Sequence, residues 1–70
     1  MAVFDGAFLI NGYEVIYWMD PKRYRCTIWW KKYQHSEFYT KQIKVMVDKD
    51  RTRLRKRVRE YLKSIPAERS

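Results

Sequence analysis

The chain has 70 residues, a formal net charge of +8 and a single cysteine, Cys26. A chain of this length forms one domain with a thin core, and one cysteine excludes an intramolecular disulfide. The sequence shows neither the pattern of a secretion signal nor the roughly 20 apolar residues that span a membrane, so we expect a soluble, cytoplasmic protein without a membrane partner. We predict a single domain over residues 1–66 and a frayed tail over residues 67–70.

The start of the chain predicts a β-hairpin around Asn11-Gly12. Residues 7–10 are apolar, and in residues 13–19 strand alternation puts Tyr13, Val15, Tyr17 and Met19 on one face and Glu14, Ile16 and Trp18 on the other, so that both faces carry large apolar groups. Asn-Gly favours a type I′ turn, because both central residues of that turn need positive φ. Two strands joined at this turn are therefore expected.

A third strand is predicted over residues 24–33, after a turn at Asp20-Pro21. Successive residues of a strand point to opposite faces, so its alternation separates an apolar face from a mixed one. The apolar face, which we assign to the core, carries Tyr24, Cys26, Ile28 and Trp30. The other face, which we expect to be exposed, carries Arg25, Thr27, Trp29, Lys31 and Tyr33.

Residues 38–47 fit two structures. Ile43, Val45 and Val47 alternate as in a strand, whereas Tyr39, Ile43 and Val47 have helical spacing. The density of β-branched residues favours a strand, although a long helix that starts here remains an alternative.

The last part of the chain predicts an amphipathic helix over residues 51–65. Its apolar stripe consists of Leu54, Val58, Tyr61, Leu62 and Ile65. Asp48 or Asp50 would cap its start, and Pro66 would end it. The predicted fold is therefore α+β: a small two-layer domain in which an antiparallel sheet of three to four strands packs on one C-terminal basic amphipathic helix.

Catalytic and metal-binding signatures are absent from the sequence. A structural zinc site needs four Cys or His ligands, and the chain offers only Cys26 and His35. We assign Cys26 to the core and His35 to a polar turn, and we assign Asp48 and Asp50 to the start of the helix rather than to a magnesium site. We expect neither an enzyme nor a cofactor.

Positive charge is concentrated near the predicted helix, because residues 49–63 carry a net +6 of the total +8. Arginines four residues apart repel each other, and we expect little acid to pair them, although a merely solvated helix face is the alternative. Arginine also binds phosphate and guanine in a bidentate manner. The candidate phosphate-binding residues are Arg51, Arg53, Arg55, Lys56, Arg57 and Arg59.

The exposed face of the third strand supplies a second candidate site. Cations alternate with flat rings there, as on surfaces that stack bases, and the candidate residues are Arg25, Trp29, Lys31 and Tyr33. A sheet and helix with Arg and Trp on a strand resembles in layout the amino-terminal DNA-binding domains of integrases, over residues 13–65. Packing around the helix, or an interface with another protein, would also account for these aromatic residues.

These features favour a small basic nucleic-acid-binding protein of the regulatory or accessory kind, with DNA favoured over RNA. The alternative is a non-enzymatic protein-interaction module, an inhibitor or adaptor, whose aromatic face binds an acidic protein partner. A homodimer is compatible with both hypotheses, because pairing would cover an edge strand.

Overall fold

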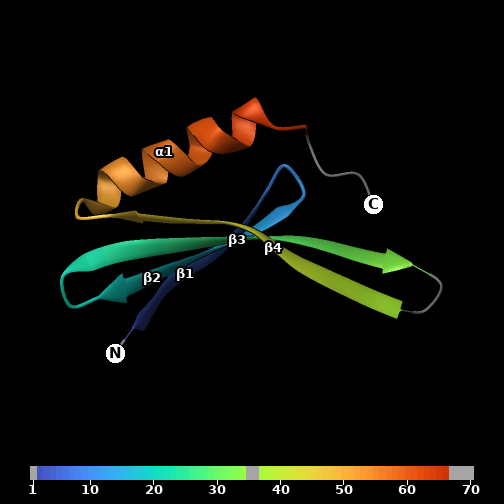
Figure 1. Ribbon diagram of the computed structural model, residues 1–70, viewed down its shortest axis with the longest axis horizontal. Coiled ribbons are helices and arrows are strands. Elements are labelled where there is room, and N and C mark those ends of the chain that lie inside the picture. Colours follow the sequence, from blue (N-terminus) through green and yellow to red (C-terminus); the bar gives the residue numbers. More distant parts are fainter. Residues whose placement is uncertain (1, 35–36, 67–70) are drawn as a thin grey trace.

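The computed structural model describes residues 2–34 and 37–66 as a four-stranded antiparallel sheet followed by one helix (Figure 1). The elements are β1 (Val3–Ile10), β2 (Tyr13–Asp20), β3 (Arg23–Gln34), β4 (Glu37–Asp48) and α1 (Arg51–Ser64). The strands lie side by side in the order β1-β2-β3-β4, and each antiparallel pair is consecutive in the chain. The predicted α+β class and two-layer architecture are confirmed; the tail predicted for residues 67–70 lies outside the described residues.

The hairpin at Asn11-Gly12 is confirmed, with φ values of 52° and 84° at its two central residues. Strand β1 starts at Val3, earlier than the apolar run predicted. The register between β1 and β2 shifts between Phe4 and Gly6, and Gly6 has a φ of 137°. Residues with a Cβ rarely adopt that backbone conformation. Gly6 therefore permits the β-bulge that leaves Asp5 without a partner in the β1–β2 register.

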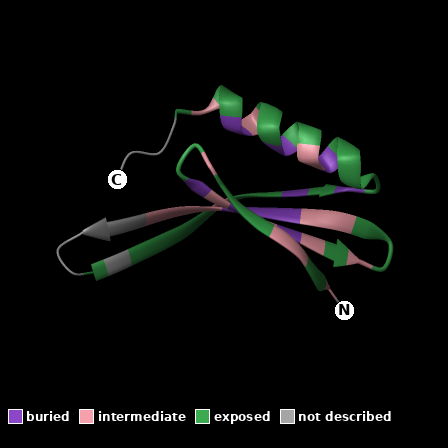
Figure 2. Ribbon diagram, turned by 180° about the vertical axis from the view of Figure 1, so that it is seen from behind, coloured by how far each residue is buried: buried purple, intermediate pink, exposed green. Residues whose placement is uncertain are grey.

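The core lies between the sheet and one side of α1, where Figure 2 shows the buried residues of the helix facing the strands. The core side chains come from β2, β3, β4 and α1: Tyr13, Val15, Tyr17, Cys26, Ile28, Met46, Leu54, Val58 and Leu62. Tyr24 and Trp30 pack against this cluster as partly buried neighbours. The predicted core face of β3 is confirmed.

Residues 38–47 belong to strand β4, which excludes the helical alternative. A bulge shifts the register between Ile28 and Trp29 of β3, so the alternation of β4 changes phase near Ile43. Ile43 packs against the core, whereas Val45 and Val47 are exposed. The three residues therefore do not share one face as the alternation predicted, and Met46 lies under the helix instead.

Helix α1 begins after Asp50, whose side chain accepts a hydrogen bond of 3.1 Å from the backbone N–H of Arg53. Its far end is fastened by Tyr13, whose hydroxyl donates to the carbonyl oxygen of Pro66 at 3.0 Å. The side chain of Asn11 donates to the carbonyl of Leu62 at 3.4 Å. Within residues 2–34 and 37–66, no helix has the length and apolar character needed to cross a membrane.

Strands β3 and β4 extend beyond the rest of the sheet as a two-stranded arm. Strand β2 pairs with β3 only from Arg23 to Trp29, so the remainder of β3 pairs with β4 alone. We call residues 30–34 and 37–41 the arm; it projects to one side in Figure 1. The molecule measures 42 × 27 × 15 Å, and the arm lies along its longest direction.

Candidate nucleic-acid interface

The sheet has one covered and one uncovered face among the described elements. Helix α1 packs over β3 and β4 on one side, and no described element lies on the other side, which we call the open face (Figure 1). Side chains of β3 that point away from α1 form a single file along the open face: Arg23, Arg25, Thr27, Trp29 and Lys31. Three of the four candidates from the sheet therefore share one surface. The prediction that this side of β3 is exposed is wrong at Thr27, which is buried, whereas Arg25, Trp29 and Lys31 are half-buried.

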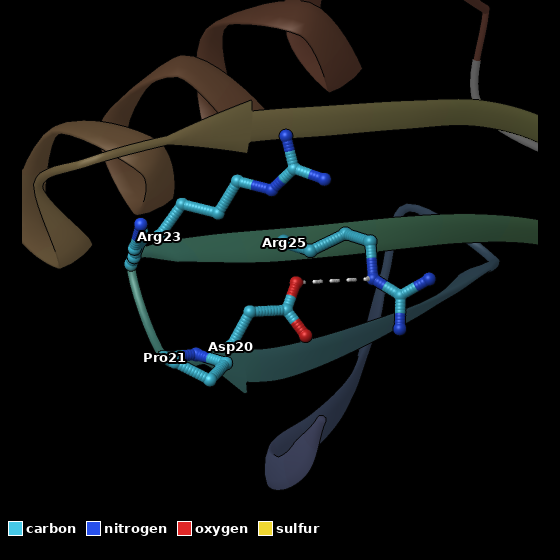
Figure 3. Close-up of a pocket in the computed structure, with 5 residues that line it drawn as sticks. Asp20, Pro21, Arg23 and Arg25 are labelled. Carbon is cyan, nitrogen blue, oxygen red and sulfur yellow. Dashed lines mark ion pairs between the residues drawn. The ribbon is translucent and has the colours of Figure 1, made fainter. Parts of the chain in front are cut away.

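Arg25 is held in place on the open face by two neighbours. Its guanidinium lies 5.6 Å from the ring centroid of Trp18, and its Nε lies 4.0 Å from a carboxylate oxygen of Asp20 (Figure 3). The indole N–H of Trp18 in turn donates to the hydroxyl of Thr27 at 3.3 Å. About 37% of the Arg25 side chain stays exposed. Its stacking on a fixed indole restricts the rotamers of a side chain that would otherwise lose much entropy on binding.

Trp29 and Lys31 continue the file toward the arm. The ring of Trp29 is half-buried, and its indole N–H has no acceptor within the described part of the chain. An enclosed donor without a partner is a cost of about 1–3 kcal/mol to the folded state. Lys31 forms an ion pair with Glu14 of β2. Tyr33 is in β3, but its side chain lies outside the described residues.

The arginines of α1 lie on the other side of the sheet, where two aspartates bind four of the five in pairs. Asp5 of β1 accepts from Arg51 at 2.9 Å and from Arg55 at 3.5 Å. These two arginines are four residues apart, so one carboxylate offsets the repulsion between them. The hydrogen bond from Arg51 lowers the pKa of Asp5 despite some opposing desolvation.

A second aspartate holds the next pair from the opposite edge of the sheet. Asp48 of β4 accepts from Arg53 at 2.7 Å and from Arg57 at 3.1 Å, and its own side chain is only 4% exposed. The hydrogen bonds from Arg53 hold the pKa of Asp48 well below its usual range. The expectation that little acid pairs the arginines was wrong, because the acid comes from the sheet rather than from the helix.

The remaining helix cations differ in their surroundings. Arg55 stacks over Tyr17, with its guanidinium 4.2 Å from the ring centroid, and only 22% of its side chain is exposed. Lys56 and Arg59 are exposed and form no ion pair with a described residue. Arg59 lines a shallow hollow beside Phe8. The structure therefore divides the candidate residues between two opposite sides of the sheet.

Three cations that the sequence did not single out lie at the end of the sheet where β2 turns into β3. Lys22, Arg23 and Lys49 line one hollow together with Val47 and Asp48. Arg23 is two residues before Arg25 in β3, so the two side chains lie on the same face. A predicted strand that started at residue 23 instead of 24 would have placed Arg23 beside Arg25. Lys49 could not have been placed without the register of β4.

Cys26 and the acidic residues offer little chemistry of their own. Burial raises the pKa of the Cys26 thiol to about 12, so the thiolate is scarce at neutral pH. Asp50 caps the helix and Asp48 is paired with two arginines. No group of three or more His, Cys, Asp or Glu side chains within the described ranges is placed to hold a metal ion. His35 lies outside those ranges.

The site as described is thus a cationic and aromatic file on an uncovered sheet, backed by a helix whose arginines are largely engaged. Comparison with known proteins supplies no identity for it, because no family model, no curated protein and no solved structure matches this chain.

Proposed function

We propose that this chain is a small nucleic-acid-binding protein of the regulatory or accessory kind, with DNA favoured over RNA, and that the open face is its contact surface. The observation that carries the proposal is the single file of Arg25, Trp29 and Lys31 on a sheet face that no described element covers. Cations there meet phosphates or base edges, and the half-buried ring offers a flat surface for stacking.

The shape of the molecule favours DNA over RNA. The major groove of B-form DNA is about 12 Å wide and admits a two-stranded ribbon, whereas the major groove of A-form RNA is deep and narrow. The arm is such a ribbon, and the file on β3 leads into it. Proteins with a sheet or ribbon in a DNA groove use this kind of contact.

The helix contributes positive electrostatic potential rather than the main contact with nucleic acid. Four of its arginines share two aspartates, so the field of the helix is weaker than its count of cations suggests. Lys56 and Arg59 remain exposed and add to the positive potential around the molecule. Such a potential speeds the encounter with a polyanion without specifying a sequence.

One observation favours a protein partner as the second candidate function. The side of the sheet away from α1 also exposes apolar groups, among them Phe4, which packs edge-on against Trp18, and Val45 and Val47 of β4. Aromatic and aliphatic groups inside a polar rim are typical of protein interfaces. An acidic protein surface would satisfy the same cations, as an inhibitor or adaptor requires.

Fluorescence anisotropy with labelled duplex DNA, single-stranded DNA and RNA over a salt series tests the proposal. We expect sub-micromolar binding to duplex DNA at about 150 mM salt, and a loss of roughly 10³ to 10⁵ in affinity from 50 to 200 mM if six to ten phosphates are contacted. The variants Arg25→Gln and Trp29→Ala should weaken binding about tenfold or more, whereas Lys56→Gln on the outer side of α1 should change it little. Binding that appears only at low salt, without preference among the three probes, would overturn the proposal and favour the protein partner.

A further inference from the structure

Lys22 and Arg23 lie where β2 turns into β3, and Lys49 directly follows β4 at the same end of the sheet. We propose that Lys22, Arg23 and Lys49 form a phosphate site that anchors one backbone phosphate of a bound nucleic acid. The phosphate site rests on the proposed function. It goes further, because nucleic-acid binding by the open face does not by itself require these three cations to bind one phosphate.

The strand register brings these cations together. Tyr24 pairs with Asp48 in the antiparallel ladder, so the next positions outward, Arg23 and Lys49, become neighbours at the end of the sheet. Lys22 precedes Arg23 in the turn, and all three side chains line one hollow. A second hollow shares Lys22 and Arg23 and continues to Arg25 on the open face (Figure 3). The site is therefore continuous with the file along β3.

The carboxylates near this site are already engaged. Asp20 is directed toward Arg25, and Figure 3 shows the guanidinium of Arg23 pointing away from it. Asp48 is enclosed and bound by Arg53 and Arg57. No carboxylate of the described residues forms an ion pair with Lys22, Arg23 or Lys49. Like charges on neighbouring strand positions destabilise a sheet, and a bound phosphate would offset that repulsion.

The position of the site would fix how nucleic acid lies on the sheet. Arg23 and Trp29 are six residues apart on one strand, a separation of about 20 Å at roughly 3.3 Å per residue. Phosphates of one DNA strand follow each other at about 3.4 Å along the helix axis, so the file would span about six nucleotides. One end of the file would then hold a phosphate, while the other end would lie against bases.

The test uses the full chain and a short duplex in the same anisotropy assay. The triple variant Lys22→Gln, Arg23→Gln, Lys49→Gln removes every cation from the one phosphate and should reduce the slope of log K against log salt by about 0.9, equally for different DNA sequences. Each of the three single variants should reduce the slope by a part of that amount. Lys56→Gln removes one positive charge on the opposite side of the molecule and should reduce the slope by less than each of the three single variants does. All four positions are exposed, and urea midpoints confirm that the variants fold.

A second measurement locates the phosphate itself. Duplexes in which one linkage at a time is a neutral methylphosphonate should lose affinity for the unaltered chain at one position in particular. At that position the triple variant should lose no further affinity, because all three cations that would contact the phosphate are already gone. If the unaltered chain binds DNA but the three variants match Lys56→Gln in slope, the phosphate site is wrong while the proposed function stands. If the unaltered chain binds no nucleic acid, the function fails and the site fails with it.

Discussion

At the scale of single residues, Asp48 joins β4 to the helix through two arginines. It is almost fully enclosed, and it also accepts the backbone N–H of Asp50 at 2.9 Å. An enclosed carboxylate with several donors stays ionised in the folded state, which explains the lowered pKa. Removal of this charge would leave Arg53 and Arg57 next to each other without a counterion.

We predict that Asp48→Asn lowers the urea midpoint at pH 7. Because the folded state lowers the pKa of Asp48, its contribution is complete above the unfolded value of about 3.9 and disappears as the pH falls toward the folded value. The difference between the two proteins should therefore shrink below about pH 4. Urea unfolding followed by circular dichroism at several pH values measures this. Glu60→Gln, at an exposed helix position, is the control, and an equal difference at pH 7 and pH 2.5 would contradict the prediction.

Cys26 provides a second prediction at this scale. The thiol is fully buried and has a pKa of about 12, whereas a free cysteine has a pKa near 8.5. Reaction with an aromatic disulfide reagent at pH 7.5 should therefore be at least roughly a thousandfold slower than for an exposed thiol, because the thiolate is the reactive species. A Cys26→Ala, Thr52→Cys variant supplies the exposed thiol for comparison. Fast labelling of native Cys26 would show that β3 opens readily.

The sequence did not predict that Asp5 and Asp48 would each pair with two arginines of the helix. The spacing of the helix arginines predicts that they repel each other, and this repulsion favours phosphate as their counterion. The paired acids, Asp5 and Asp48, are 46 and 5 positions from the first arginine that each one binds. Only the fold brings Asp5 to the helix, so the sequence could not show that a sheet carboxylate would take that role.

At the scale of elements, the start of α1 depends on its capping residue. The first turn of a helix leaves backbone N–H groups unpaired, and the side chain of Asp50 accepts one of them from Arg53. We predict that Asp50→Ala costs about 1 kcal/mol of stability, within a range of 0.5–2 kcal/mol. Asp50→Ser keeps an acceptor and should retain most of the stability in urea unfolding. A serine variant as unstable as the alanine variant would show that the charge matters and the cap does not.

Periodicity predicted the elements well wherever the period was uninterrupted. The stripe of Leu54, Val58 and Leu62 gave the buried side of α1, and the alternation of Cys26 and Ile28 gave the core face of β3. Bulges defeat this kind of prediction, because one extra residue reverses every later side chain of the strand. The bulge near Ile43 is the reason that Val45 and Val47 were grouped with the wrong neighbour.

At the scale of the whole molecule, charge is distributed on two sides of a thin sheet. The alternation of β3 predicts that Arg25, Trp29 and Lys31 share a face, and the helical period groups the cations of α1. Neither pattern predicts whether these two groups lie on the same side of the sheet. That relation follows from the side of the sheet on which α1 packs. The sequence thus supplied the members of each surface, and the tertiary structure separated them.

The arm provides the last prediction, because Trp30 is its only described residue that packs against the core. Every core residue belongs to β2, α1, the part of β3 that pairs with β2, or the part of β4 beneath the helix. Lys32 and Tyr39 are directly opposite in the ladder, so residues 33–38 can be replaced by Asn-Gly, which suits a two-residue hairpin turn. We expect this shortened chain to lose no more than about 2 kcal/mol of stability, since it gives up only two cross-strand pairs.

Binding should respond differently from stability. If the ribbon enters the major groove, the shortened chain should bind duplex DNA about tenfold or more weakly at 150 mM salt while it still unfolds cooperatively in urea at a modestly lower midpoint. Ile28→Ala is the opposite control, because a cavity in the core costs about 2–5 kcal/mol without altering the arm. If the shortened chain binds as tightly as the unaltered one, the contact with DNA is made by the file between Arg23 and Lys31 and does not involve the removed residues. A shortened chain that unfolds would show instead that the ladder of the arm supports the sheet beneath it.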